Sequence, residues 1–189
     1  MLNAIILALL TACLGIGSLW LLKGLEQEVR TAREYSLDEP DYYLENMTRT
    51  RTGSNGSVRN ILRAPIVEHF PGDDSMKLDR PHLEIYGDED KPWQVVADRG
   101  WMSSGNEVVL LHGDVEIWRE GDDGRRSYEV LTEELRVLPE EQYAETQQPA
   151  VIVAPGGITH SIGMRANFGH GRLELIERVR SRYEQKLQQ

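Results

Sequence analysis

The pattern of residues 93–117 constrains the fold more than any other stretch of the chain. Residues 93–98 read Trp-Gln-Val-Val-Ala-Asp, an alternation typical of a strand with one mostly apolar face. Residues 103–106 have the composition of a turn, since Gly and Asn readily adopt positive φ. Residues 108–117 return as a second, largely apolar strand. We expect this strand to bend at Gly113, because a glycine inside a strand usually marks a bulge or a close approach of another segment.

Looser copies of the start of this unit recur along the chain. A short β-prone run ends in a small residue four times, at Ala64, Ala97, Thr132 and Ala166. These positions are 33, 35 and 34 residues apart. A near-constant period predicts stacked supersecondary units that share one core. The alternative is that any antiparallel β domain shows such a spacing by chance.

Turn signals divide much of the remaining chain into short strands. Residues 53–56, Gly-Ser-Asn-Gly, predict a hairpin between residues 42–51 and residues 57–64. We expect Pro65 to restrict strand pairing beyond it. The pattern of residues 173–183 fits either a strand or a short helix. Because no long amphipathic helix stands out beyond the N-terminal region, the predicted fold class is all-β, with many short strands.

The first 22 residues carry no charged side chain. As a helix, residues 2–22 would cover about 30 Å, the thickness of one bilayer core. We expect a retained membrane anchor. The two alternatives are a cleaved secretory signal and a lipoprotein signal that ends at Cys13. Lys23, Arg30 and Arg33 follow the span, and by the positive-inside rule they favour a cytoplasmic soluble domain.

Small residues recur along the predicted anchor. Ala4, Ala8 and Ala12 are spaced by four, and Gly15 lies on the neighbouring face. Small residues in register let a partner helix approach closely, so these four predict a packing face inside the membrane. The alternative is that Ala and Gly are common in any membrane span.

These patterns give the chain four parts. The predicted boundaries are a transmembrane anchor over residues 1–22, a charged linker over residues 23–40, a β domain over residues 41–184 and a C-terminal tail over residues 185–189.

The soluble region carries no signal for catalysis or nucleic-acid binding. All 31 acidic and 21 basic side chains follow Leu22, which gives this region a net charge of −10. A nucleic-acid surface needs clustered Lys and Arg, so we expect no such partner. The five histidines are dispersed without metal-ligand spacing, the single cysteine lies in the predicted anchor, and no nucleophile motif occurs. We therefore predict no enzymatic activity, no metal and no cofactor, and a β domain that holds an acyl ligand or adds a partner's strand at its edge.

Taken together, these features resemble the LptC family, the inner-membrane-anchored components of the lipopolysaccharide transport system. The uncharged N-terminal span is one part of the likeness. The other parts are residues 62–68 (Leu-Arg-Ala-Pro-Ile-Val-Glu), 92–98 (Pro-Trp-Gln-Val-Val-Ala-Asp), 111–117 (Leu-His-Gly-Asp-Val-Glu-Ile), 164–167 (Met-Arg-Ala-Asn) and 174–180 (Glu-Leu-Ile-Glu-Arg-Val-Arg). Some of these pieces also occur in the related bridge protein LptA, whereas the anchor and the Glu-Leu-Ile-Glu ending favour LptC.

The resemblance implies a twisted β-jellyroll in the periplasm, tethered to the inner membrane by one span, with no catalytic activity of its own. It also implies partners: the LptB, LptF and LptG transporter complex, lipopolysaccharide in the jellyroll interior, and LptA at the C-terminal edge. The periplasmic placement rests on the family likeness and overrides the weak charge signal of the flanking basic residues.

A groove for the lipid would be lined by inward-facing apolar side chains. The expected lining, with the last residue near the exit edge, is Leu78, Ile85, Trp93, Val95, Ala97, Leu111, Val115, Ile117, Val153 and Leu173. Ordinary core packing is the alternative for each of them. At the level of function, the alternative is a tethered adaptor that only docks partner proteins and never contacts lipid. An undetected hydrolase would need a convergent polar site, which the sequence does not offer.

Overall fold

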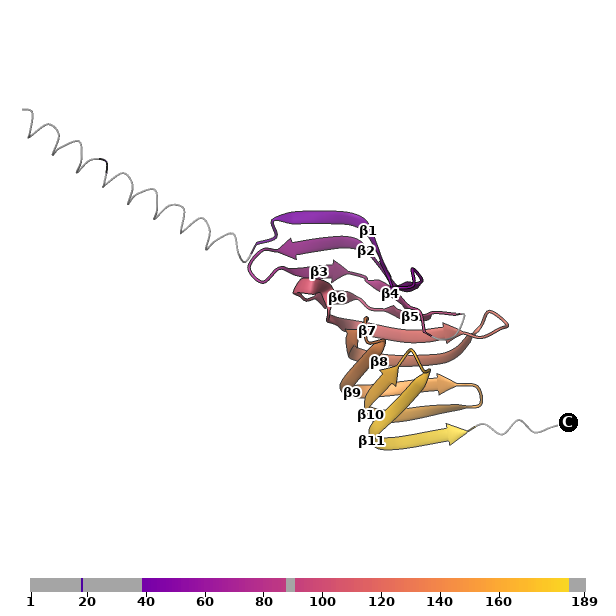
Figure 1. Cartoon of the computed structure of the whole chain (residues 1–189). Helices are drawn as coiled ribbons and strands as arrows, with labels where there is room; N and C mark the ends of the chain where they lie inside the picture. The colour runs from indigo at the N-terminus through magenta and orange to yellow at the C-terminus, as the bar shows by residue number, and fades with distance from the viewer. Residues whose placement is uncertain (1–17, 19–38, 88–90, 184–189) are drawn as a thin grey trace, which may run out of the picture.

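The computed structural model describes residue 18, residues 39–87 and residues 91–183 (Figure 1). The predicted anchor lies outside these residues except for Ser18, and so do residues 23–38 of the predicted linker and the predicted tail. In the part of the chain that the structure describes, no helix is long and apolar enough to cross a membrane.

The described chain is an antiparallel β structure, which confirms the predicted all-β class. Its strands are β1 (Tyr42–Thr52), β2 (Val58–Phe70), β3 (Ser75–Asp79), β4 (His82–Ile85), β5 (Trp93–Val96), β6 (Arg99–Met102), β7 (Val109–Glu120), β8 (Arg126–Leu138), β9 (Tyr143–Ala154), β10 (Gly157–Asn167) and β11 (Arg172–Tyr183), with one 3-10 turn, η1 (Ser104–Asn106), before β7.

All the strands belong to one sheet with two ends. β7 to β11 pair in chain order, and β1 pairs with β2 at the other end. Figure 1 shows β1 and β11 at opposite ends of the sheet. Two pairs of short strands each act as one longer strand that is interrupted in the middle. β4 and β3 pair with successive parts of β2, and β5 and β6 pair with successive parts of β7.

A line of irregularities crosses the second half of the sheet. The pairing register shifts between His112 and Val115 on β7, between Leu131 and Arg136 on β8, and between Ile162 and Met164 on β10. A bulge bends its strand and increases the local twist. Because these shifts affect the successive pairings β7–β8, β8–β9 and β9–β10, they let the sheet fold over on itself and enclose an interior.

Gly113 is the position of this bend on β7, as predicted. It has φ +92°, which an L side chain rarely adopts. A Cβ atom here would lie 2.4 Å from Oδ2 of Asp98, so the close approach excludes any side chain. The same Asp98 oxygen accepts a hydrogen bond from the backbone N–H of Asp114, at 3.0 Å. The interruption between β5 and β6 is thus tied to the bulge in β7.

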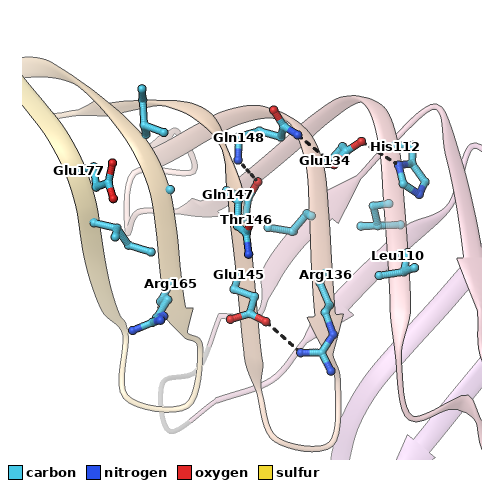
Figure 2. A pocket seen from close by; sticks show the side chains of 15 residues that line it. Leu110, His112, Glu134, Arg136, Glu145, Thr146, Gln147, Gln148, Arg165 and Glu177 are labelled. Carbon is cyan, nitrogen blue, oxygen red and sulfur yellow. Dashed lines mark hydrogen bonds and ion pairs between the residues drawn. The ribbon is translucent and has the colours of Figure 1, made fainter.

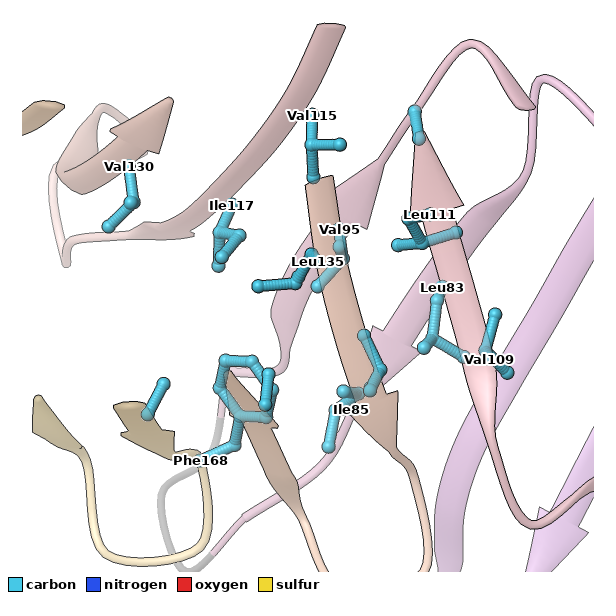
Figure 3. Packing of buried hydrophobic residues seen from close by; sticks show 14 of the residues in the cluster. Leu83, Ile85, Val95, Val109, Leu111, Val115, Ile117, Val130, Leu135 and Phe168 are labelled. Carbon is cyan, nitrogen blue, oxygen red and sulfur yellow. The ribbon is translucent and has the colours of Figure 1, made fainter. Parts of the chain in front are cut away.

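The enclosed interior holds one hydrophobic cluster to which both halves of the sheet contribute. Figure 3 shows part of it, including Leu83 and Ile85 of β4, Val95 of β5 and Leu135 of β8. Each of these side chains follows the period-2 alternation of its strand, so burial of one face sets the register.

Two sequence expectations need correction or sharpening. Pro65 does not end strand pairing: β2 continues to Phe70. Pro65 lies between the segment that pairs with β4 and the segment that pairs with β3, where a missing N–H breaks no ladder bond. Residues 173–183, which fitted a strand or a helix, form strand β11.

The repeated small residues are only partly equivalent. Ala64 lies between the two pairing segments of β2, Ala97 between β5 and β6, and Thr132 beside the register shift of β8. Ala166 lies three residues beyond Gly163, the positive-φ position of β10. The predicted period therefore coincides with the bends in three of the four units.

Candidate functional site

The interior opens into a cleft of about 410 Å³ near the β11 end of the sheet. Strands β5, β7, β8, β9, β10 and β11 all contribute to it. Its lining is Trp93, Ile117, Arg119, Tyr128, Val130, Ile152, Ala154, Met164, Ala166, Asn167, Phe168, Gly171, Arg172 and Leu173. Most of these side chains are apolar, and no part of the set resembles a catalytic constellation.

The cleft has a buried floor and an exposed mouth. Ile117, Val130 and Met164 are almost fully buried, whereas Tyr128 is 45% exposed and Leu173 is 39% exposed. The floor continues directly into the hydrophobic core, because Ile117 and Val130 belong to both. A flexible apolar chain that enters at Tyr128 and Leu173 would gain roughly 0.8 kcal/mol for each CH₂ group it buries.

Two arginines stand at the edge of this apolar space. The guanidinium of Arg119 lies 4.9 Å from the centre of the Trp93 ring, within the range of a cation–π contact. Arg172 forms an ion pair with Glu174, at 2.7 Å. The indole Nε1 of Trp93 is buried and has no hydrogen-bond partner among the described residues. Glu174 balances the charge of Arg172, so apolar walls with Arg119 at the rim suit a lipid whose head carries negative charge.

The structure distributes the ten predicted groove residues unequally. Trp93, Ile117 and Leu173 line the cleft. Six others are buried in the core away from the cleft lining and come together there as a packed interior: Leu78, Ile85, Val95, Ala97, Leu111 and Val115. Whether any of the ten contacts a lipid stays a prediction.

Val153 does not face the interior, so its expected orientation is wrong. On β9 the side chains of Ala150 and Ile152 are buried, and Val153 lies between Ile152 and Ala154 in a strand where alternate residues face opposite sides. Ile152 and Ala154 line the cleft instead. The short apolar run Val151-Ile152-Val153 has no polar residue to reveal which of its members faces inward.

Sequence reasoning missed several cleft residues. Met164 and Ala166 belong to one of the recurring motifs, and their alternation with Arg165 was a usable signal. Phe168 continues the same alternation, Met164-Arg165-Ala166-Asn167-Phe168, although its backbone lies in the turn after β10. Arg119 and Tyr128 lie on β7 and β8 next to a loop, where periodicity is weakest.

A second cleft, of about 560 Å³, lies over strands β7 to β11 (Figure 2). Charged and amide groups dominate it and pair with one another. Arg136 contacts Glu145 at 2.9 Å, and the side-chain amide of Gln148 donates to Glu134 at 3.1 Å. Because these groups satisfy each other, this surface offers less to a ligand than the apolar cleft does.

Metal binding finds no support among the described residues, since no group of three His, Cys, Asp or Glu side chains is placed to hold an ion.

The two end strands offer another kind of site. β11 exposes Ile176, Val179 and Tyr183, and β1 exposes Tyr43. An end strand presents backbone N–H and C=O groups to which another strand can pair.

The chain is similar to a known protein family and to a solved structure. A family model described as "LptC: Lipopolysaccharide-assembly, LptC-related" matches residues 5–184. Among solved structures, the chain is similar to LptH from Pseudomonas aeruginosa, described as the LptA homologous periplasmic component of the conserved lipopolysaccharide transport device. The TM-score is 0.50 at 7% identity, over 74% of this chain and 96% of that chain. At this identity the likeness concerns the fold alone. A search of curated protein sequences gives no match.

Proposed function

Because the chain belongs to the LptC-related family of lipopolysaccharide-assembly proteins, we propose that its interior cleft holds the acyl chains of lipopolysaccharide during transfer. The family places the chain in lipopolysaccharide transport and is not a family of enzymes. In the finer proposal, the protein accepts the lipid from the LptB, LptF and LptG transporter and passes it to LptA.

The cleft itself carries this proposal. It joins an apolar floor at Ile117 and Met164 to an exposed mouth at Tyr128 and Leu173. Acyl chains would lie on the floor, where burial stabilises them. The anionic head would lie at the mouth, near Arg119. The net charge of −10 does not oppose this, because the head would contact Arg119 locally rather than the whole surface.

The end strands support a bridge between two partners. β1 and β11 lie at opposite ends of one continuous sheet, so strand addition at each end would extend that sheet in both directions (Figure 1). We assign LptA to β11, whose exposed Ile176 and Val179 offer apolar contacts beside the backbone. A lipid that leaves the cleft past Leu173 would then reach the partner directly.

The N-terminal segment completes the proposal. A membrane helix over residues 1–22 would hold the β domain on the periplasmic side of the inner membrane, beside the transporter. Ala4, Ala8, Ala12 and Gly15 would pack on the permease helices. Bulky replacements at Ala4, Ala8 and Ala12 should then alter coupling to ATP hydrolysis. An unchanged ATPase rate together with unchanged copurification would contradict this part.

Photo-crosslinking in intact cells tests the cleft. A photoreactive amino acid at position 128 or 173 should capture lipopolysaccharide, because both side chains lie at the mouth. The matched controls are Glu129 and Glu174, the next residues on the same strands, which do not belong to the cleft lining. Capture from the two controls alone would overturn the proposal.

The adaptor function remains the second candidate, because both end strands are available for pairing. It predicts that the purified full-length protein joins its partners yet binds no lipopolysaccharide. Measured binding of the lipid to the purified protein separates the two functions.

A further inference from the structure

We propose that the turn between β10 and β11, residues 168–171, is a gate on the interior cleft and that Phe168 is its plug. An acyl chain that enters the cleft takes the place of the Phe168 ring and lifts the turn off its neighbours. This inference rests on the proposed function, because it describes how the same cleft admits a lipid.

Phe168 holds an unusual position in the core. Its side chain is only 3% exposed, yet its backbone belongs to a turn rather than to a strand. Figure 3 shows its ring together with buried side chains that come from the strands. The ring lies 5.6 Å from that of Trp93, and both rings line the cleft. Phe168 therefore fills apolar space beside the cleft from the first residue of the turn that follows β10.

Hydrogen bonds connect the turn to two other segments. The backbone N–H of Phe168 donates to the carbonyl oxygen of Gln142, at 2.7 Å. The side-chain amide of Gln142 donates in turn to the carbonyl oxygen of Tyr86. The third bond is local, since the backbone N–H of His170 donates to Oδ1 of Asn167, at 2.9 Å.

Close packing at two glycines makes this contact specific. A Cβ atom at Gly87 would lie 2.5 Å from the carbonyl oxygen of Phe168 and 3.2 Å from Cα of Gly169. A Cβ atom at Gly169 would lie 2.6 Å from Oε1 of Gln142. The closed position of the turn therefore requires glycine at positions 87 and 169. Even an alanine side chain at either position would push the turn away from its contacts.

Exchange of the ring for a lipid chain leaves the apolar floor covered. Ile117 and Trp93 would lose contact with a benzyl group and gain contact with methylene groups, so little apolar surface returns to water. Opening breaks the backbone hydrogen bond from Phe168 to Gln142, and water that enters as the turn moves outward can replace this partner. Burial of acyl methylene groups offsets this cost.

Opening of the turn would also move the start of the C-terminal edge strand, β11. β11 begins at Arg172, directly after the turn, and Leu173 lines the cleft. A turn that moves outward carries the start of β11 with it. Lipid in the cleft would then change the edge strand to which we assign the acceptor.

Hydrogen exchange of the full-length protein in nanodiscs tests the gate, with hexa-acylated lipid A as the probe. On lipid binding, the Phe168 amide should exchange at least tenfold faster, while amides of β7 around Ile117 stay equally or better protected. Bound lipid with an unchanged or slower Phe168 amide overturns the gate and leaves the proposed function intact. Absence of any binding overturns the proposed function and the gate with it.

Two variants make the test independent of folding defects. Gly87→Ala should speed exchange at Phe168 without lipid and raise the rate of lipid uptake severalfold. Phe168→Leu replaces the ring with a smaller apolar side chain that is easier for the lipid to displace, and it should tighten lipid binding about threefold. The control is Phe70→Leu, because Phe70 lies at the end of β2 beneath Lys77 and outside the cleft lining. The gate would be contradicted if Gly87→Ala left the rate of lipid uptake unchanged. It would also be contradicted if Phe168→Leu and Phe70→Leu changed lipid binding equally.

Discussion

The imidazole of His69 forms hydrogen bonds through Nδ1 with Oδ1 of Asp41, at 2.6 Å, and through Nε2 with Oδ1 of Asp74, at 2.8 Å. Because ionised carboxylates only accept hydrogen bonds, this arrangement favours the imidazolium form of the ring, in which both nitrogens carry protons. The Tyr42 ring stacks on it at 4.4 Å, and Ser104 donates to the second oxygen of Asp74, at 3.0 Å. Four segments at the β1 end of the sheet are thus connected through the His69 ring and its carboxylate partners.

This cluster predicts a pH-dependent stability. Hydrogen bonds to Asp41 and Asp74 raise the pKa of His69 above its ordinary value, and the bond from His69 lowers the pKa of Asp74. The stabilisation by His69 is therefore fully present below about pH 6.5 and is lost as the pH rises through its raised pKa. At the acid end it is lost as the pH falls through the lowered pKa of Asp74.

Denaturant unfolding at pH 6 and pH 9 measures the effect. His69→Gln should lower the free energy of unfolding by about 1 kcal/mol at pH 6 and by less at pH 9, the modest size reflecting the solvent access of both carboxylates. His160→Gln is the control, since His160 is exposed on β10. An equal effect of His69→Gln at both pH values would show that its charge contributes nothing.

Gly113 and Asp98 give a second prediction. Gly113→Ala adds a Cβ atom where Asp98 already lies, and it must also adopt φ +92°. We expect a loss of about 3 kcal/mol in the free energy of unfolding, from backbone strain and the broken Asp98–Asp114 bond. Gly156→Ala has nearly the same φ, +94°, with no atom near its Cβ, and should lose only about 1 kcal/mol. Equal losses would mean that the close approach to Asp98 is unimportant.

The sequence predicted the bend at Gly113 because glycine is informative by itself inside an alternating strand. The hairpin around residues 53–56 was predictable for the same local reason, and β1 and β2 do pair there. Pro65 misled because its effect depends on whether its missing N–H would have met a partner. That property is set by β3 and β4, which lie elsewhere in the chain.

The cleft was harder to predict than the fold. An apolar alternation shows that a side chain faces inward, but it does not distinguish a filled core from an open cleft. Val95 and Ile117 have the same pattern in sequence, yet only Ile117 lines the cleft. The difference arises where β10 and β11 fold across the interior, and the alternation that ends at Phe168 does not reveal that its ring lies against Trp93 of β5.

Neighbouring residues on opposite faces of β9 test the cleft. Ala154→Phe adds a ring inside a cleft of about 410 Å³ and should weaken lipopolysaccharide binding about tenfold, by displacing two or so methylene groups of the ligand. Val153→Phe adds similar bulk on the opposite face and should leave binding unchanged. Binding to the purified full-length variants is the measurement. A loss from Val153→Phe alone would favour the orientation expected from sequence.

Charge on the edge of β11 tests the assignment of LptA. Val179 is 48% exposed on this end strand, beside the backbone groups that a partner strand would use. A lysine on an edge strand opposes strand addition, because pairing would bring its charge against the apolar side chains of the partner. Val179→Lys should therefore weaken LptA pull-down about tenfold while lipopolysaccharide binding in the cleft is retained. The matched control is Tyr43→Lys on β1, whose side chain is exposed at the opposite end of the sheet, and it should leave LptA docking unchanged. Loss from the β1 variant but not from the β11 variant would reverse the assignment, and equal retention by both would mean that LptA docks on neither edge.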